Sequence, residues 1–282
     1  QKQPSGTPGA LDAANAVNSI LEFVGRTLLW FTSFLAALAG NLLDASIRYS
    51  LSIGEKQIMT AVRAGWVVFR DLANMFFIFA LLYIAFATML QIANFDTKRT
   101  LAKLVVVGLL LNFSLFFSQI VIDVSNVLAY TAYKSVAARG TEGWTKSSLS
   151  EPFMKQFGLA GIYTVGKQGL DLTQEKDKNV KNNLWLIMLM SGIFIFIVAF
   201  IFLVAAAVFL IRTIKLLFLM TLSPLAFIAF ILPGTEKYAK DWWRMLLGES
   251  FVAPLFLLLI YVTLKMSDGL NGAIASVGGK AD

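Results

Sequence analysis

Four charged residues lie within or beside long apolar stretches, where an ionisable side chain could carry chemistry. They are the carboxylates Asp123 and Glu249 and the cations Arg212 and Lys215. Ionisable groups inside membrane segments often belong to ion or proton pathways, but long cationic side chains also extend to the interface. We favour a headgroup position for Asp123, an ion pair with a neighbouring helix for Glu249, and the interface for the two cations. A pathway lined by all four is the alternative.

Uncharged amides form a second polar pattern. Asn112, Gln119 and Asn126 recur at heptad spacing, on the side that also carries Asp123. Polar residues between membrane helices commonly serve as packing contacts, and we favour that role over a pore-facing one.

Tryptophan and arginine mark the expected membrane interfaces. Arg63, Trp66 and Arg70 recur at three- and four-residue steps, so they share one helix face. Trp242 and Trp243 follow a charged segment, where an aromatic belt is expected. We interpret Trp66, Arg70, Trp242 and Trp243 as interface anchors rather than a substrate site.

Several kinds of enzyme are excluded by composition. The chain contains no Cys and no His, which removes thiol nucleophiles, His-based triads and the commonest metal ligand. The 17 acidic residues do not cluster at metal-ligand spacing. Gly54-Glu55-Lys56 lacks the other positions of a phosphate-binding loop. We therefore expect no enzymatic activity, no cofactor and no metal.

The elements that position these residues follow from hydrophobicity. Of 282 residues, 57% are apolar and only 15% are charged, against about 25% charged in an average soluble domain. This predicts an all-α, polytopic helical membrane protein with four to six membrane segments, amphipathic interfacial helices and one polar extracytoplasmic loop. The net charge of +7 fits membrane topology and anionic lipid better than nucleic acid.

The chain divides into six consecutive segments. A polar lead-in precedes an apolar segment that either crosses the membrane or lies in its interface. We expect spans at 73–92, 101–128, 184–211 and 245–266, and an amphipathic helix at 52–72. The predicted segments are 1–16 (mobile lead-in), 17–72 (apolar segment and amphipathic helix), 73–132 (two spans), 133–183 (polar loop), 184–266 (C-terminal membrane region) and 267–282 (frayed tail).

The longest apolar stretch must break. Leu184–Leu232 is 49 residues long with two charges, and as one helix it would measure about 74 Å, against about 30 Å of hydrocarbon. Ser223-Pro224 supplies the break, because proline removes a backbone donor and restricts the preceding residue. We predict a helix over 184–222, then a short apolar segment over 225–232, either re-entrant or packed at the inner surface, that ends at Pro233-Gly234.

Basic residues orient these segments. Lys98, Arg99 and Lys103 mark one cytoplasmic loop, and Lys237, Lys240 and Arg244 mark another. The polar loop 133–183 is then outside. The chain begins at Gln1 rather than Met, which we interpret as a removed signal peptide or a trimmed chain; signal removal would place the N-terminus outside the cytoplasm.

A family resemblance rests on residues of the C-terminal half. The relevant stretches are Leu222-Ser223-Pro224-Leu225-Ala226-Phe227, Leu232-Pro233-Gly234-Thr235-Glu236-Lys237 and Trp242-Trp243, followed by one apolar span. They resemble the polytopic inner-membrane core protein of type IV secretion systems, the TrbL/VirB-six family. Gly65-Trp66 with Arg70-Asp71 and Asn74 looks similar too, so the resemblance covers about 55–266. The chain departs from the family in its few N-terminal spans and short outer loop.

The resemblance implies a non-enzymatic role in the bacterial inner membrane. Such a protein would be a homo-oligomer in membrane lipid that supports pilus assembly or substrate passage. Its partners would be secretion ATPases, the periplasmic scaffold and pilin, with no direct nucleic-acid site. The alternative function is a stand-alone membrane channel or transporter.

Overall fold

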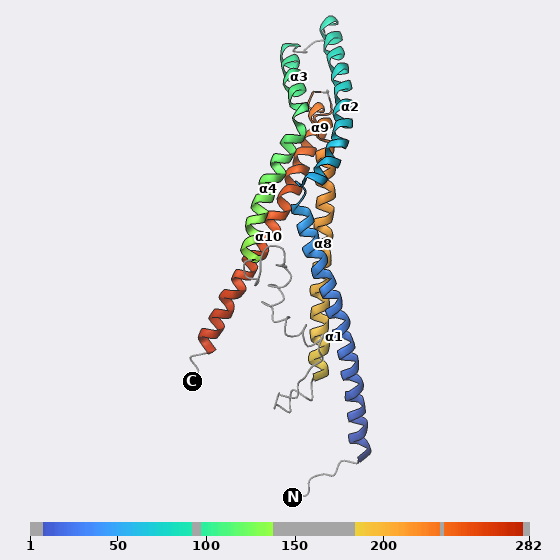
Figure 1. Cartoon of the computed structure of the whole chain (residues 1–282), viewed down its shortest axis with the longest axis vertical. Coiled ribbons are helices and arrows are strands. Elements are labelled where there is room, and N and C mark those ends of the chain that lie inside the picture. Colours follow the sequence, from blue (N-terminus) through green and yellow to red (C-terminus); the bar gives the residue numbers. More distant parts are fainter. Residues whose placement is uncertain (1–7, 92–96, 138–183, 232–233, 279–282) are drawn as a thin grey trace. The chain divides into compact units, whose positions relative to one another are not determined.

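Helices account for almost all of the described chain. The computed structural model describes residues 8–91, 97–137, 184–231 and 234–278, which are helical apart from short turns. Figure 1 shows the helices coloured in chain order. Their bounds are α1 Pro8–Leu51, α2 Lys56–Met89, α3 Thr97–Asn112, α4 Ser114–Ala137, α8 Leu184–Thr221, α9 Ser223–Ile228 and α10 Glu236–Gly278.

Five of these helices are long and apolar enough to cross a membrane. The candidate spans are Ser19–Leu51, Lys56–Met89, Ser114–Val136, Met188–Thr221 and Glu236–Leu270. Large apolar side chains remain exposed along them, including Phe79 and Phe200, as suits a surface in contact with lipid. The chain is thus a polytopic helical membrane protein, which confirms the fold class predicted from composition.

The helices contribute to two compact units, which are described separately. These units differ from the consecutive segments predicted from the sequence, because α1, α4, α8 and α10 each contribute to both units. Within the described residues, the first unit comprises 8–46, 136–137, 184–207 and 264–278, and the second comprises 47–91, 97–135, 208–231 and 234–263.

Two glycines bring α1 and α8 close together in the first unit. A Cβ atom at Gly25 would lie 3.1 Å from Cβ of Met188, and one at Gly192 would lie 3.0 Å from Cδ2 of Leu28. The two helices run in the same direction, since the contact on α8 advances as α1 advances. Small residues at such contacts are typical of membrane helix pairs, because they let the backbones approach.

In the second unit, the chain continues past the turn after α1 without reversing. Successive positions along the turn and α2 contact successively earlier positions of α4 and α3, so this stretch runs antiparallel to the α3–α4 pair. The contacting pairs are Gly54 with Asp123, Met59 with Gln119, Trp66 with Ser114, and Phe77 with Gly108. Ser50, at the end of α1, lies near Asn126, because both bind Arg212. The turn at 52–55 therefore connects two helical stretches that run in the same direction, and it is not a hairpin turn.

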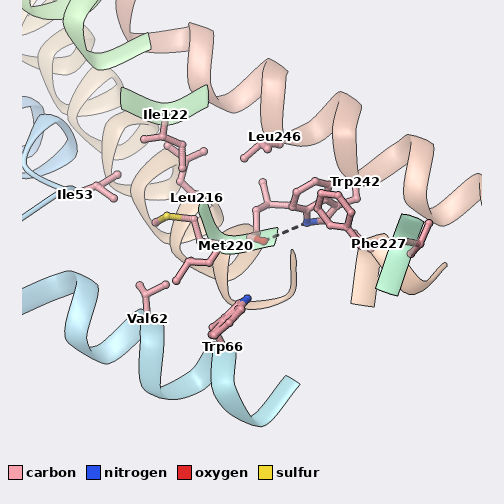
Figure 2. Packing of buried hydrophobic residues seen from close by; sticks show 13 residues of the cluster. Ile53, Val62, Trp66, Ile122, Leu216, Met220, Phe227, Trp242 and Leu246 are labelled. Atoms are coloured by element: carbon pink, nitrogen blue, oxygen red, sulfur yellow. Dashed lines mark hydrogen bonds between the residues drawn. The ribbon is translucent and has the colours of Figure 1, made fainter. Parts of the chain in front are cut away.

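The core of the second unit forms around aromatic side chains (Figure 2). Phe227 of α9 packs against Trp242 and Trp243 of α10, with ring centroids 6.1 and 6.0 Å apart. Trp66 of α2 belongs to the same buried cluster. The short helix α9 contacts both α2 and α3, so protein surrounds the irregular backbone beside it, as membrane depth requires.

The predicted break in the long apolar stretch is confirmed. Helix α8 ends at Thr221 and α9 begins at Ser223, with Pro224 as its second residue. Gly234 has a positive φ of 86°, which glycine adopts without strain. Pro233 and the rest of 232–233 lie outside the described residues, as does most of the polar loop, 138–183.

Other predicted boundaries were wrong. The amphipathic helix at 52–72 and the span at 73–92 form one helix, α2, and the segments 235–244 and 245–266 form one helix, α10. Helix α10 also continues to Gly278, through most of the tail predicted to fray, and α1 begins at Pro8, inside the predicted lead-in. No break lies between these pieces because none has a turn-forming residue strong enough to stop a helix.

The predicted span 101–128 divides instead into α3 and α4. The division lies at Phe113, where the amide donates to the carbonyl of Leu110 rather than to a residue four positions back. Asp123 is consequently the tenth residue of α4 and not the end of a long span. This removes the reason for placing Asp123 at the headgroups.

Candidate functional site

Arg212 is the centre of a buried polar cluster in the second unit. Its side chain is almost wholly enclosed, with 1% of its surface exposed. Nε donates to the carbonyl of Glu249 at 2.8 Å, and Nη2 donates to the carbonyl of Ser250 at 3.1 Å and to Oδ1 of Asn126 at 3.3 Å. Nη1 donates to the carbonyl of Ser50 at 3.4 Å and to its hydroxyl. These bonds engage all the N–H groups that a guanidinium offers.

The backbone explains why these acceptors are available to Arg212. Ser50 is the penultimate residue of α1, and the last four carbonyls of a helix have no donor within it. Pro254 lies inside α10 and has no N–H, so the carbonyl of Ser250, four residues earlier, loses its helical partner. Arg212 and the hydroxyl of Ser125 both donate to that carbonyl.

The charge of Arg212 is thus balanced mainly by backbone dipoles. A helix C-terminus carries a partial negative charge, and α1 ends one residue after Ser50. The sequence predicted that this guanidinium extends to the membrane interface. That prediction is wrong, because these backbone acceptors hold the guanidinium in the core. It ties together the end of α1, α4 and the proline-containing part of α10.

Glu249 contacts both cations of α8, through different atoms. Its carbonyl accepts from Arg212, and its Oε1 lies 2.5 Å from Nζ of Lys215. The Lys215 side chain is 49% exposed, and that of Glu249 is 17% exposed. The predicted pairing of Glu249 with a basic residue of another helix is confirmed.

The predicted amides separate into different environments. Asn126 joins the Arg212 cluster. Gln119 donates to Sδ of Met59 at 3.5 Å, which fits the packing role. Asn112 donates to the carbonyl of Gly108 within its own helix and is exposed. These three residues therefore do not form one polar line.

A second polar cluster joins the two helix breaks. The indole of Trp66 donates to Oγ of Ser114 at 3.0 Å, and Oγ of Ser223 lies 3.2 Å from the same oxygen. Ser114 is the first residue of α4 and Ser223 is the first residue of α9. The break between α3 and α4 therefore lies against the break between α8 and α9.

The approach of α2 to α8 near these breaks requires a glycine. A Cβ atom at Gly65 would lie 2.8 Å from Cγ2 of Thr221. The Thr221 hydroxyl donates to the carbonyl of Leu217 at 2.8 Å, which fixes its rotamer, so the methyl group cannot turn away without breaking that bond.

The tryptophans expected as interface anchors have different positions. Trp66 and Trp242 are buried, and the indole of Trp242 donates to the carbonyl of Leu219 at 3.2 Å, near the end of α8. Both belong to the core because buried acceptors satisfy their N–H groups. Trp243 is half-buried against Phe227. Arg70 lies over the ring of Trp66, 5.1 Å from its centroid, and pairs with Asp71.

The sequence interpretation missed the serines. Ser50, Ser125 and Ser250 bind or surround Arg212, and Ser114 and Ser223 join the helix breaks. Serine is so common that a single serine in a sequence does not indicate a buried polar cluster. Pro254 is the stronger indicator, since a proline in a helix leaves a free carbonyl four residues earlier.

The described residues offer no metal centre, since they contain no group of three or more His, Cys, Asp or Glu side chains that could hold an ion. Comparison of the chain with models of protein families, with curated proteins and with solved structures gives no match.

Proposed function

We propose that this protein is an inner-membrane component of a type IV secretion machine, as its resemblance to the TrbL/VirB-six family implies. It would oligomerise in the membrane and support pilus assembly or substrate passage without enzymatic activity. Its partners would be the secretion ATPases, the periplasmic scaffold and pilin.

One structural observation supports this proposal most. The long apolar helix α8 ends at a proline-containing break, the short helix α9 packs inside the unit, and α10 then begins with a charged stretch that contains Trp242-Trp243. This is the order of elements on which the resemblance rests. The buried contacts of α9 are expected of a framework, because they fix one backbone path through an irregular region.

The alternative of a stand-alone channel has less support. It requires Arg212, Lys215, Asp123 and Glu249 to line a path. All the N–H groups of Arg212 are engaged with protein acceptors, and Glu249 pairs with Lys215. Charges held in this way stabilise helix contacts and leave few free groups to bind a passing ion.

A transfer assay in cells separates the two functions. Cells that lack the gene are complemented with Asp123→Asn or Lys215→Gln, which remove charge at exposed side chains, or with Trp242→Ala, which removes buried core. The platform proposal expects near-normal transfer with the charge variants and loss with Trp242→Ala. Loss with both charge variants at normal protein levels would contradict the platform proposal.

A further inference from the structure

A cluster of cations lies where α3 and α10 meet in the second unit. Nζ of Lys103 is 3.3 Å from Oε1 of Glu236, and this ion pair joins the first turn of α10 to the second turn of α3. The two side chains are about half exposed, so the contact is at the surface.

Helical spacing adds two further cations beside this pair. Lys240 lies one turn after Glu236 on the same face of α10, and Lys237 lies three residues before Lys240. Both are exposed, and within the described residues neither has an ion-pair partner. We call Lys103, Lys237 and Lys240 the basic end. Glu236 faces Lys103 and Lys240, and Asp241, one turn after Lys237, pairs with Arg244.

Exposed apolar side chains lie close to the basic end. On α3, Val106 lies one turn after Lys103 on the same face and is 55% exposed, and on α10 Tyr238, next to Lys237, is 69% exposed. Lysine stems along apolar surface with their ammonium groups at the polar boundary, and tyrosine beside them, are typical of the lipid headgroup layer.

The three lysines also lie at similar positions along the helix axes. The four residues from Glu236 to Lys240 correspond to about 6 Å of rise, and the ion pair places Lys103 beside Glu236. A spread of that size fits within one headgroup layer, whose thickness is about 5–8 Å on each side of the hydrocarbon.

We propose that the basic end binds the phosphate headgroup of an anionic phospholipid, whose acyl chains lie along the exposed apolar face of α3. The lysines supply the charge, and Glu236 holds Lys103 in place while it opposes part of that charge. An acidic protein segment is the other chemistry that could match these cations. Lipid is favoured because Val106, one turn beyond Lys103, continues the surface as an exposed apolar side chain, and because a candidate membrane span begins at Glu236.

The test is a lipid-binding titration on the full chain in neutral detergent. Phosphatidylglycerol and phosphatidylcholine with the same dansyl-labelled acyl chain are titrated separately, and binding is read as energy transfer from tryptophan. Wild type should prefer phosphatidylglycerol. Since one lysine near an anionic surface is worth about fivefold in affinity, Lys237→Gln with Lys240→Gln should weaken phosphatidylglycerol binding by roughly 25-fold and leave phosphatidylcholine binding unchanged.

Two variants make the test specific. Glu236→Gln removes the opposing charge and should tighten phosphatidylglycerol binding by about fivefold, a gain that a misfolded protein cannot imitate. Lys56→Gln with Arg63→Gln removes two exposed cations of α2 that have no ion-pair partner among the residues the structure describes, and it should leave affinity unchanged. Equal binding of the two lipids by wild type, or equal losses in both double variants, would overturn the assignment. Tighter binding of a soluble polyglutamate peptide than of phosphatidylglycerol would replace the lipid with an acidic protein partner.

Discussion

Arg212→Met is the perturbation that tests the buried polar cluster most sharply. Methionine fills much of the same volume but donates no hydrogen bond. The carbonyl and hydroxyl of Ser50, both buried, would lose their guanidinium donor, and the carbonyl of Ser250 would keep only Ser125. A buried polar group left without a partner costs about 1–3 kcal/mol.

The expected net loss is smaller than the sum of these costs. Removing a buried charge also removes its desolvation penalty, which opposes the hydrogen-bond loss. We therefore expect Arg212→Met to lower the free energy of unfolding by about 2–4 kcal/mol. Arg212→Lys should give an intermediate loss, because an ammonium cannot span acceptors on three helices as the planar guanidinium does.

A double-mutant cycle with Pro254→Ala identifies the cause. Alanine restores an N–H to α10 at the position that can donate to Ser250. In the Pro254→Ala background the carbonyl of Ser250 has a backbone donor besides Arg212. Arg212→Met should therefore lower the free energy of unfolding by about 1 kcal/mol less than it does in wild type. Unfolding is measured by far-ultraviolet circular dichroism during titration with dodecyl sulfate in mixed micelles.

The control for this prediction is Lys215→Met, which removes a half-exposed cation three residues away on the same helix. Exposed ion pairs contribute about 0–1 kcal/mol, so its effect should be small. An Arg212→Met variant within about 0.5 kcal/mol of wild type, or a strictly additive cycle with Pro254→Ala, would refute the role given to Arg212.

Three further predictions concern helix packing and use the same unfolding assay. Gly65→Ala should lower stability, because its Cβ would lie 2.8 Å from the fixed methyl group of Thr221; no change would mean that α2 and α8 are not in close contact. Gly248→Ala should instead raise stability by up to about 1 kcal/mol, since its Cβ meets nothing within 4 Å and alanine favours helix; a loss would indicate an unseen neighbour. Trp242→Phe should cost about 1 kcal/mol, because it removes the hydrogen bond to Leu219, and an unchanged stability would show that this bond contributes nothing.

Local chemistry made some features predictable from the sequence. The break at Ser223-Pro224 follows from the missing donor and restricted backbone of proline, and it lies where the sequence placed it. The pairing of Glu249 was also foreseen, since a carboxylate one turn inside an apolar helix needs a cation. Both inferences depend on local chemistry that is the same in any fold: proline lacks a backbone donor, and a carboxylate in an apolar helix requires a cation.

Other features depend on contacts distant in sequence. Arg212 is buried because Ser50, which is 162 positions earlier in the chain, ends a helix beside it, and no local pattern indicates that neighbour. Trp242 belongs to the core because the carbonyl of Leu219 satisfies its indole. The break at Phe113 has no proline or glycine to mark it. Pro254, in contrast, does not stop α10, since Arg212 and Ser125 compensate for the donor it lacks.

The most direct test of the proposed function is the mass and composition of the particle extracted from its native membrane. The full chain is purified in mild detergent, its particle mass is measured, and co-purifying proteins are identified. The proposal predicts a large homo-oligomer that carries secretion ATPases and periplasmic scaffold proteins. A single-copy particle without them, after extraction that leaves the scaffold itself intact, would contradict it.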